Sequence, residues 1–82
     1  MNKIILYSSS ECIRCRLVRQ MLDVHNVQYE EIVDDKQLML DKGFTEAPGI
    51  EENNQIIDTY SSVLSWLQKN GWYSFGEVSD DD

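Results

Sequence analysis

The chain contains two cysteines, Cys12 and Cys15, which are separated by two residues and accompanied by Arg14 and Arg16. A pair with this spacing can exchange disulfides, supply two ligands of a metal site, or form a permanent crosslink. As a crosslink it would close a very short loop, which the chain-entropy model values at only about 2 kcal/mol. Exchange chemistry or metal binding therefore explains the pair better than stabilisation does.

A metal centre would need ligands that the sequence does not supply. A closed zinc site takes its remaining ligands from a second Cys-x-x-Cys or from a pair of histidines. The chain has no third cysteine, and its single histidine, His25, stands where we expect the exposed end of a helix. We expect no metal ion, with a metal or iron–sulfur cluster shared between two chains as the alternative.

Redox exchange has a physical mechanism at this position, because the apolar pattern starts a helix at the pair. Unpaired backbone N–H groups and the positive end of the helix dipole stabilise a thiolate there. Arg14 and Arg16 add positive charge, whereas Glu11 opposes it. We expect Cys12 to attack a disulfide as the thiolate and Cys15, one turn later, to resolve the mixed disulfide. This chemistry needs no cofactor beyond the redox-active Cys12–Cys15 disulfide itself.

The elements that would hold the pair follow from the apolar pattern. A run with β-branched residues over 3–7 predicts a buried strand, apolar residues at spacings of three and four predict a helix over 13–25, and residues 27–33 predict a second strand. A crossover of this length joins parallel strands. The pair is therefore expected after the first strand, where its helix begins.

The second half of the sequence predicts a short helix, a hairpin and a last helix. We expect Asp34-Asp35 to cap the short helix and Gly43 to end it in the left-handed conformation. Asn53-Asn54 tolerates positive φ and predicts the turn of the hairpin. Ser61-Ser62 is expected to supply the cap of the last helix, which ends at Asn70-Gly71.

The composition indicates a single globular domain that does not bind nucleic acid. Fifteen acidic residues against seven basic ones give a formal charge of −8 over 82 residues, which repels phosphate backbones. The apolar run Ile4–Leu6 is far too short to span a membrane, and it follows no leader pattern. We expect a monomer in the cytoplasm, where thiols stay largely reduced and a close pair is more often catalytic than structural.

Three stretches make the sequence similar to the glutaredoxin branch of the thioredoxin superfamily: Tyr7-Ser8, Cys12-Ile13-Arg14-Cys15 at the helix start, and Glu46-Ala47-Pro48 before the hairpin. The similarity covers residues 1–70 as one glutaredoxin-like domain and leaves 71–82 as an aromatic and then acidic tail. Within this branch the chain most resembles the glutaredoxin-like redoxins that reduce ribonucleotide reductase. The resemblance implies an α/β fold with a four-stranded mixed sheet and three flanking helices.

The same resemblance implies a surface for the partner around the catalytic Cys12 and Cys15. It consists of Ile13, Arg14, Ala47, Pro48, Thr59 and Tyr60. Pro48 would form a cis peptide bond facing the cysteines, and the backbone of Ala47 would pair with a docked strand. The expected client is a protein disulfide, with ribonucleotide reductase first, which would place the protein in deoxyribonucleotide synthesis and cell redox homeostasis.

The positions that hold glutathione in glutaredoxins depart from the family pattern. Ser9 stands where a lysine is usual, and Asp58-Thr59 followed by Tyr60-Ser61 replace a glycine pair, so side chains should crowd the groove. The redoxin subgroup also lacks these glycines, and the expected reductant is therefore thioredoxin reductase. Glutathione stays open as an alternative reductant. The basic residues that would then pair with its carboxylates are Arg14, Lys36 and Lys42.

A non-catalytic binding module is a further alternative. Trp72, Tyr73 and Phe75 follow the last helix and, if exposed, would anchor a partner. In a core this small they are instead expected to fold back over the sheet or a helix. Removing residues 72–82 would separate the two possibilities, because only the first predicts lost binding without lost stability.

Overall fold

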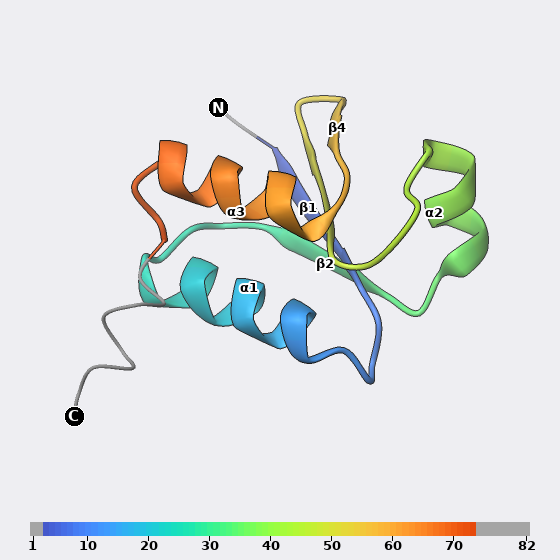
Figure 1. The fold of residues 1–82 in the computed structure, drawn as a ribbon, viewed down its shortest axis with the longest axis horizontal. Coiled ribbons are helices and arrows are strands. Elements are labelled where there is room, and N and C mark those ends of the chain that lie inside the picture. Colours follow the sequence, from blue (N-terminus) through green and yellow to red (C-terminus); the bar gives the residue numbers. More distant parts are fainter. Residues whose placement is uncertain (1–2, 74–82) are drawn as a thin grey trace.

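The computed structural model describes residues 3–73 and has the expected α/β architecture of a four-stranded mixed sheet with three helices (Figure 1). Its elements in chain order are β1 (Ile4–Ser8), α1 (Ile13–Val24), β2 (Glu30–Val33), α2 (Lys36–Lys42), β3 (Gly49–Glu52), β4 (Gln55–Ile57) and α3 (Tyr60–Lys69). Cys12 precedes α1 and Cys15 lies in its first turn, so the pair follows β1 at the helix start, as the apolar pattern predicts.

The sheet has the strand order β2-β1-β3-β4, with β1 and β3 in its interior. β1 runs parallel to β2 and pairs Leu6 with Glu31, while it runs antiparallel to β3 and pairs Leu6 with Ile50. β3 and β4 form the expected hairpin, whose turn holds Asn53 and Asn54 at positive φ. α1 connects the two parallel strands, which confirms the predicted strand–helix–strand unit.

Side chains alternate between the two faces of β1 and divide the core into two clusters. The larger cluster joins β1 and β3 to α1 and α3, which lie side by side over one face of the sheet (Figure 1). Its buried members are Ile4, Leu6, Val18, Met21, Leu22, Ile50, Val63, Trp66 and Leu67. The smaller cluster of Tyr7, Met39 and Phe44 packs α2 and the following loop against the opposite face.

β2 is shorter than predicted and spans Glu30–Val33. The N–H of Val27 bonds to the Leu22 carbonyl at 3.0 Å and closes the end of α1, so this donor is not available to the sheet. Val27 and Tyr29 nevertheless pack against the larger cluster. The exposed His25 is the C-cap of α1, at the helix end where it was expected.

α2 has both predicted caps, whereas α3 ends at Asn70 as predicted but does not begin at the predicted cap. Asp35 caps the start of α2 through its carboxylate, and Gly43 closes the helix at a φ of 96°. The expected cap at Ser61-Ser62 is wrong, because α3 begins at Tyr60 and the Thr59 hydroxyl accepts the N–H of Ser62 at 3.3 Å. Threonine is a common N-cap residue, but Thr59 has a φ of 69°, which is rare for a β-branched residue and differs from the extended conformation usual at a cap.

Trp72 and Tyr73 fold back onto the larger cluster, as expected for a small core. The Trp72 N–H donates to the Leu67 carbonyl at 2.8 Å, and its ring meets Trp66 edge to face with the centroids 5.3 Å apart. Trp72 and Tyr73 therefore cover the larger cluster just beyond the end of α3. Phe75 and the tail over 78–82, which ends in three aspartates, lie outside the described residues.

Candidate redox site

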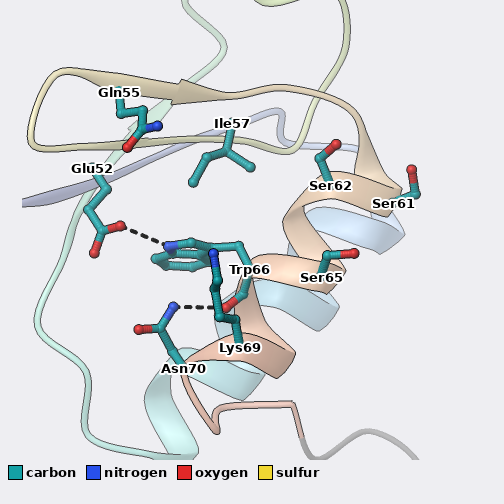
Figure 2. Close-up of a pocket in the computed structure, with 9 residues that line it drawn as sticks. All are labelled: Glu52, Gln55, Ile57, Ser61, Ser62, Ser65, Trp66, Lys69 and Asn70. Atoms are coloured by element: carbon teal, nitrogen blue, oxygen red, sulfur yellow. Dashed lines mark hydrogen bonds between the residues drawn. The ribbon is translucent and has the colours of Figure 1, made fainter.

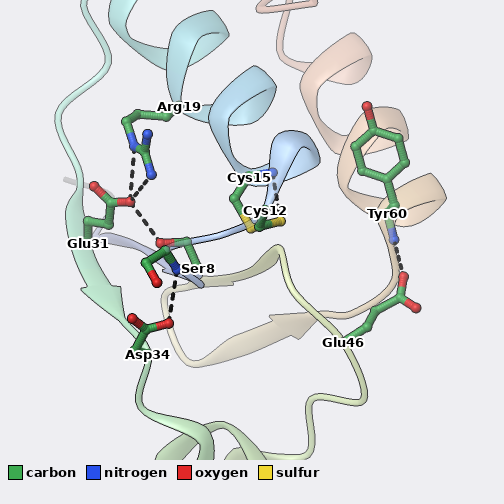
Figure 3. Close-up of a disulfide and its surroundings, with 9 residues drawn as sticks. Ser8, Cys12, Cys15, Arg19, Glu31, Asp34, Glu46 and Tyr60 are labelled. Atoms are coloured by element: carbon green, nitrogen blue, oxygen red, sulfur yellow. Dashed lines mark hydrogen bonds and ion pairs between the residues drawn. A yellow bond between two sulfur atoms is a disulfide. The ribbon is translucent and has the colours of Figure 1, made fainter.

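Cys12 and Cys15 form a disulfide at the start of α1, with their Cα atoms 5.2 Å apart (Figure 3). Cys12 is the N-cap residue of the helix, and its sulfur accepts the N–H of Cys15 at 3.0 Å. Cys12 is half-buried, whereas Cys15 is fully buried. An incoming sulfur can therefore reach Cys12 first, while the protein shields Cys15.

The two residues between the cysteines face solvent. Ile13 is 73% exposed, and Arg14 is exposed as well. The Arg14 guanidinium lies over the Tyr60 ring, 4.8 Å from its centroid, in a cation–π contact between the first turns of α1 and α3. The structure thus brings two of the predicted partner-binding residues, Arg14 and Tyr60, into contact with each other.

The segment that enters β3 carries the predicted proline. The Ala47–Pro48 peptide bond is cis, as the resemblance implied, and Pro48 is fully buried. In the view of Figure 3, the chain leaving Glu46 rises toward the disulfide before it enters β3. A Cβ atom at Gly49 would overlap the Phe44 ring, so the first position of β3 requires glycine. Sequence reasoning did not single out this glycine.

Two carboxylates tie the loop before Pro48 to the start of α3, through four residues hereafter named the loop–helix latch: Thr45, Glu46, Asp58 and Tyr60. The backbone N–H and the hydroxyl of Thr45 donate to the Asp58 carboxylate at 3.1 and 2.7 Å. Glu46 accepts the N–H of Tyr60 at 2.9 Å. Burial alone would raise the pKa of Asp58, but hydrogen bonds, first from Thr45 and then from the backbone of Thr59 and Glu46, outweigh it and lower this pKa. The latch therefore contains an ionised carboxylate held in place by its donors.

Thr59 lies between Asp58 and Tyr60, two residues of the latch, and has an unusual backbone conformation. Its φ of 69° and ψ of 146° fall close to a region that almost only glycine populates. The hydrogen bonds of Asp58 and Tyr60 hold the turn on either side, and the Thr59 hydroxyl caps α3. The backbone at Thr59 thus has a conformation typical of glycine, but the residue has a side chain. That side chain occupies volume that a glycine at this position would leave empty.

A second set of hydrogen bonds surrounds the other side of the cysteine loop. The fully buried Ser8 donates its hydroxyl to Glu31 at 2.8 Å, and the Arg19 guanidinium binds the same oxygen at 2.7 Å (Figure 3). Burial would raise the pKa of Glu31, but the bonds from Arg19 and Ser8 lower it overall. Asp34 accepts the Ser10 N–H at 2.9 Å, and this bond lowers its pKa. These contacts connect β1, β2 and α1 around the disulfide.

Sequence reasoning did not predict the hydrogen bonds that carboxylates make on both sides of the disulfide. Glu31, Asp34, Glu46 and Asp58 bond to groups that lie between 12 and 24 positions away along the chain. The only signal available was an acidic residue beside an expected loop. With fifteen acidic residues in the sequence, that signal could not choose among them.

The three basic residues considered as partners of glutathione do not converge on one place. Arg14 stacks on Tyr60, whereas Lys42 binds the Glu51 carboxylate at 3.1 Å on the α2 face of the sheet. Lys36 lines a small apolar groove between α2 and the loop that follows it. Of the three, only Arg14 lies in the first turn of α1, between the two cysteines of the disulfide.

A separate polar groove lies between the β3–β4 hairpin and α3 (Figure 2). Its lining residues are Glu52, Gln55, Ile57, Ser61, Ser62, Ser65, Trp66, Lys69 and Asn70. Trp66 donates its indole N–H to Glu52 at 3.0 Å across this groove. Neither cysteine lines it, so the groove is distinct from the redox site.

Among residues 3–73, no three side chains of histidine, cysteine, aspartate or glutamate converge as ligands for a metal ion. None of the helices in the described part of the chain combines the length and the apolar character needed to cross a membrane.

No protein-family model and no curated protein sequence matches this chain, but solved structures do. Glutaredoxin 1 from Francisella tularensis, crystallised with cacodylate, has a TM-score of 0.67 at 18% identity and covers 87% of this chain and 93% of its own. A thioredoxin-like protein has a TM-score of 0.67 at 24% identity, covering 80% and 96%. A buckwheat glutaredoxin–glutathione complex has a TM-score of 0.66 at 19% identity, covering 87% and 72%. These neighbours show that the chain has the thioredoxin-like fold of glutaredoxins.

Proposed function

We propose that this chain is a thiol–disulfide oxidoreductase, a small glutaredoxin-like redoxin that reduces disulfides in client proteins. The observation that carries the proposal is the disulfide at the start of α1, in which the half-buried Cys12 lies outside the buried Cys15. The fold shared with glutaredoxins supports it.

The start of α1 favours the thiolate of Cys12. The N–H of Cys15 already points at the Cys12 sulfur at 3.0 Å, and this bond becomes charge-assisted when that sulfur is ionised. The positive end of the helix dipole acts in the same direction. Cys12 is therefore the attacking sulfur, and the shielded Cys15 is the resolving one.

The reaction begins from the reduced dithiol. The Cys12 thiolate attacks one sulfur of a client disulfide, which forms a mixed disulfide and releases the other client sulfur as a thiolate that takes up a proton. Cys15 then gives up its proton and attacks the Cys12 sulfur, which releases the second client thiol. The client has gained two electrons and two protons, and the chain holds the Cys12–Cys15 disulfide.

The client and the reductant follow from the resemblance. Ribonucleotide reductase is the favoured client, docking over Ile13, Arg14 and the Ala47–Pro48 segment, and thioredoxin reductase is the favoured reductant. Such a protein works as a cytoplasmic monomer without a bound cofactor. Glutathione is the second candidate reductant, supported by the buckwheat glutaredoxin–glutathione complex among the structural neighbours. Reduction by thioredoxin reductase with NADPH, compared with reduction by glutathione with glutathione reductase, separates the two.

The Cys15→Ser variant tests the proposed exchange. It keeps the attacking Cys12 but lacks the resolving thiol, so incubation with insulin should produce a covalent adduct that dithiothreitol releases on an electrophoresis gel. Cys12→Ser is the matched control, because its remaining thiol occupies the buried position, and it should form little adduct. Equal trapping by both variants, or none by Cys15→Ser, would refute the proposal.

A further inference from the structure

A carboxylate from another part of the chain occupies the N-terminus of α3. Glu46 accepts the N–H of Tyr60, the first residue of this helix, at 2.9 Å. The first N–H groups of a helix lack partners within the helix and lie at the positive end of its dipole, so they attract carboxylates and phosphates. At α3 the Glu46 side chain already fills one of these positions.

This helix end borders the redox site. The Arg14 guanidinium stacks over the Tyr60 ring, 4.8 Å from the ring centroid, and Arg14 lies between the two cysteines in sequence. Figure 3 shows Glu46 and Tyr60 together on one side of the disulfide. A small thiol that approached Cys12 with a carboxylate of its own would find Arg14 and the start of α3 as its favourable partners.

The chain's own groups oppose such a thiol. The N–H of Tyr60 is bonded to Glu46, and the N–H of Ser62 is bonded to the Thr59 hydroxyl. Asp58, which the latch holds in its ionised form, adds a negative charge immediately before the cap of α3. An external carboxylate would have to displace Glu46 and remain close to a second carboxylate.

We propose that Glu46 is a specificity-determining residue that keeps glutathione and other carboxylate-bearing small thiols from reducing the Cys12–Cys15 disulfide, leaving that step to a protein dithiol. The inference rests on the proposed disulfide exchange and adds to it the choice of reductant. Glutathione carries two carboxylates, and the chain it approaches has a formal charge of −8, which adds a general repulsion to the local charges of Glu46 and Asp58. Glu46 acts on the approach of the thiol and takes no part in the bond exchange.

The test compares two monothiols that differ in charge. Reduction of the Cys12–Cys15 disulfide is followed with glutathione and with uncharged 2-mercaptoethanol, by alkylation of the freed thiols and mass spectrometry. We expect the ratio of the two rate constants to rise about fivefold in Glu46→Gln and further in Glu46→Lys, because the first change removes the repelling charge and the second reverses it. The rise should shrink at high salt.

Glu30→Gln is the matched control. It removes the same charge from the exposed strand β2, where Glu30 pairs with Ile5 at the end of β1 away from the cysteines, and its ratio of rate constants should equal that of the unmodified chain. An unchanged ratio in both Glu46 variants would overturn the proposal, and so would an equal rise in Glu30→Gln. Glu46 is exposed, so its variants should fold. Insulin reduction tests the proposed function separately, and its failure would leave the ratio measurable.

Discussion

Glu46 and Glu51 lie on either side of Pro48, and the fold places them in opposite surroundings. Glu46 is exposed and binds the backbone N–H of Tyr60 next to the redox site. Glu51 is only 6% exposed and accepts the Tyr7 hydroxyl at 2.8 Å beneath α2. The comparison teaches that the same side chain can govern the approach of a reductant at the surface and the stability of the fold in the interior.

The buried carboxylate belongs to a network of three residues. Lys42, the last residue of α2, binds Glu51 at 3.1 Å. The Tyr7 hydrogen bond lowers the pKa of Glu51, burial opposes this, and Lys42 lowers the pKa further. Burial and the Glu51 carboxylate raise the pKa of Tyr7 to about 12. The network ties the end of α2 to the two central strands.

The largest effect is expected from Glu51→Ala, which would leave the buried Tyr7 hydroxyl without an acceptor and Lys42 without its partner. We expect the free energy of unfolding at pH 7, measured by urea denaturation, to fall by about 3 kcal/mol. The folded pKa of Glu51 lies below its ordinary value of 4.5, so its stabilisation is full above that pH and is lost as the pH falls through the folded value. The gap between variant and unmodified chain should therefore shrink in acid. A difference in the free energy of unfolding below about 1 kcal/mol at pH 7 would mean that the network does not stabilise the packing of α2 on the sheet.

Tyr7→Phe should have a smaller effect, because it removes one donor and leaves the Glu51–Lys42 pair in place. We expect a loss of about 1 kcal/mol at pH 7. The folded pKa of about 12 lies above the ordinary 10.0, so the stabilisation is full below pH 10 and is lost as the pH rises toward 12.

Urea denaturation at a series of alkaline pH values measures the difference in the free energy of unfolding between Tyr7→Phe and the unmodified chain. This difference should decrease as the pH rises. Tyr29 also has a pKa raised to about 12, by burial and Asp23, but it is present in both proteins, so the difference between them isolates Tyr7. A gap that stayed constant up to pH 12 would contradict the assignment of the hydrogen bond.

The smallest effect on stability is expected from Glu46→Gln. Its side chain is exposed, and the amide oxygen can still accept the N–H of Tyr60, so the free energy of unfolding should change by less than about 0.5 kcal/mol. The same urea titrations measure it. A loss of unfolding free energy above about 1.5 kcal/mol would show that the hydrogen bond of Glu46 stabilises the fold, as the bonds of Glu51 do. The expected difference between the two carboxylates would then be wrong.

Features that depend on neighbouring residues could be predicted from residue types. The helix start at Cys12, the cap at Asp35 and the left-handed closure at Gly43 all follow from local chemistry, and the structure has them. The cap at Thr59 could not be predicted in this way, because only the latch bonds on either side hold a β-branched residue at a φ of 69°.

The surroundings of the two carboxylates could not be predicted either. Glu51 and Glu52 are adjacent, and alternation along β3 sends them to opposite faces of the sheet. Nothing in their type shows that one would be buried under α2 with Tyr7 while the other would bind Trp66. The position of α2 on the sheet decides which carboxylate loses contact with water.

The sequence by itself determined the cysteine pair at a helix start and the hairpin, because these depend on residues within a few positions of one another. It also determined the parallel strand–helix–strand unit, because a crossover of this length joins parallel strands. Only the tertiary structure decided that Arg14 lies over Tyr60, that Glu46 reaches the start of α3 and that Glu51 is buried. Those contacts join segments that are far apart in the chain, and the packing of the helices on the two faces of the sheet brings them together.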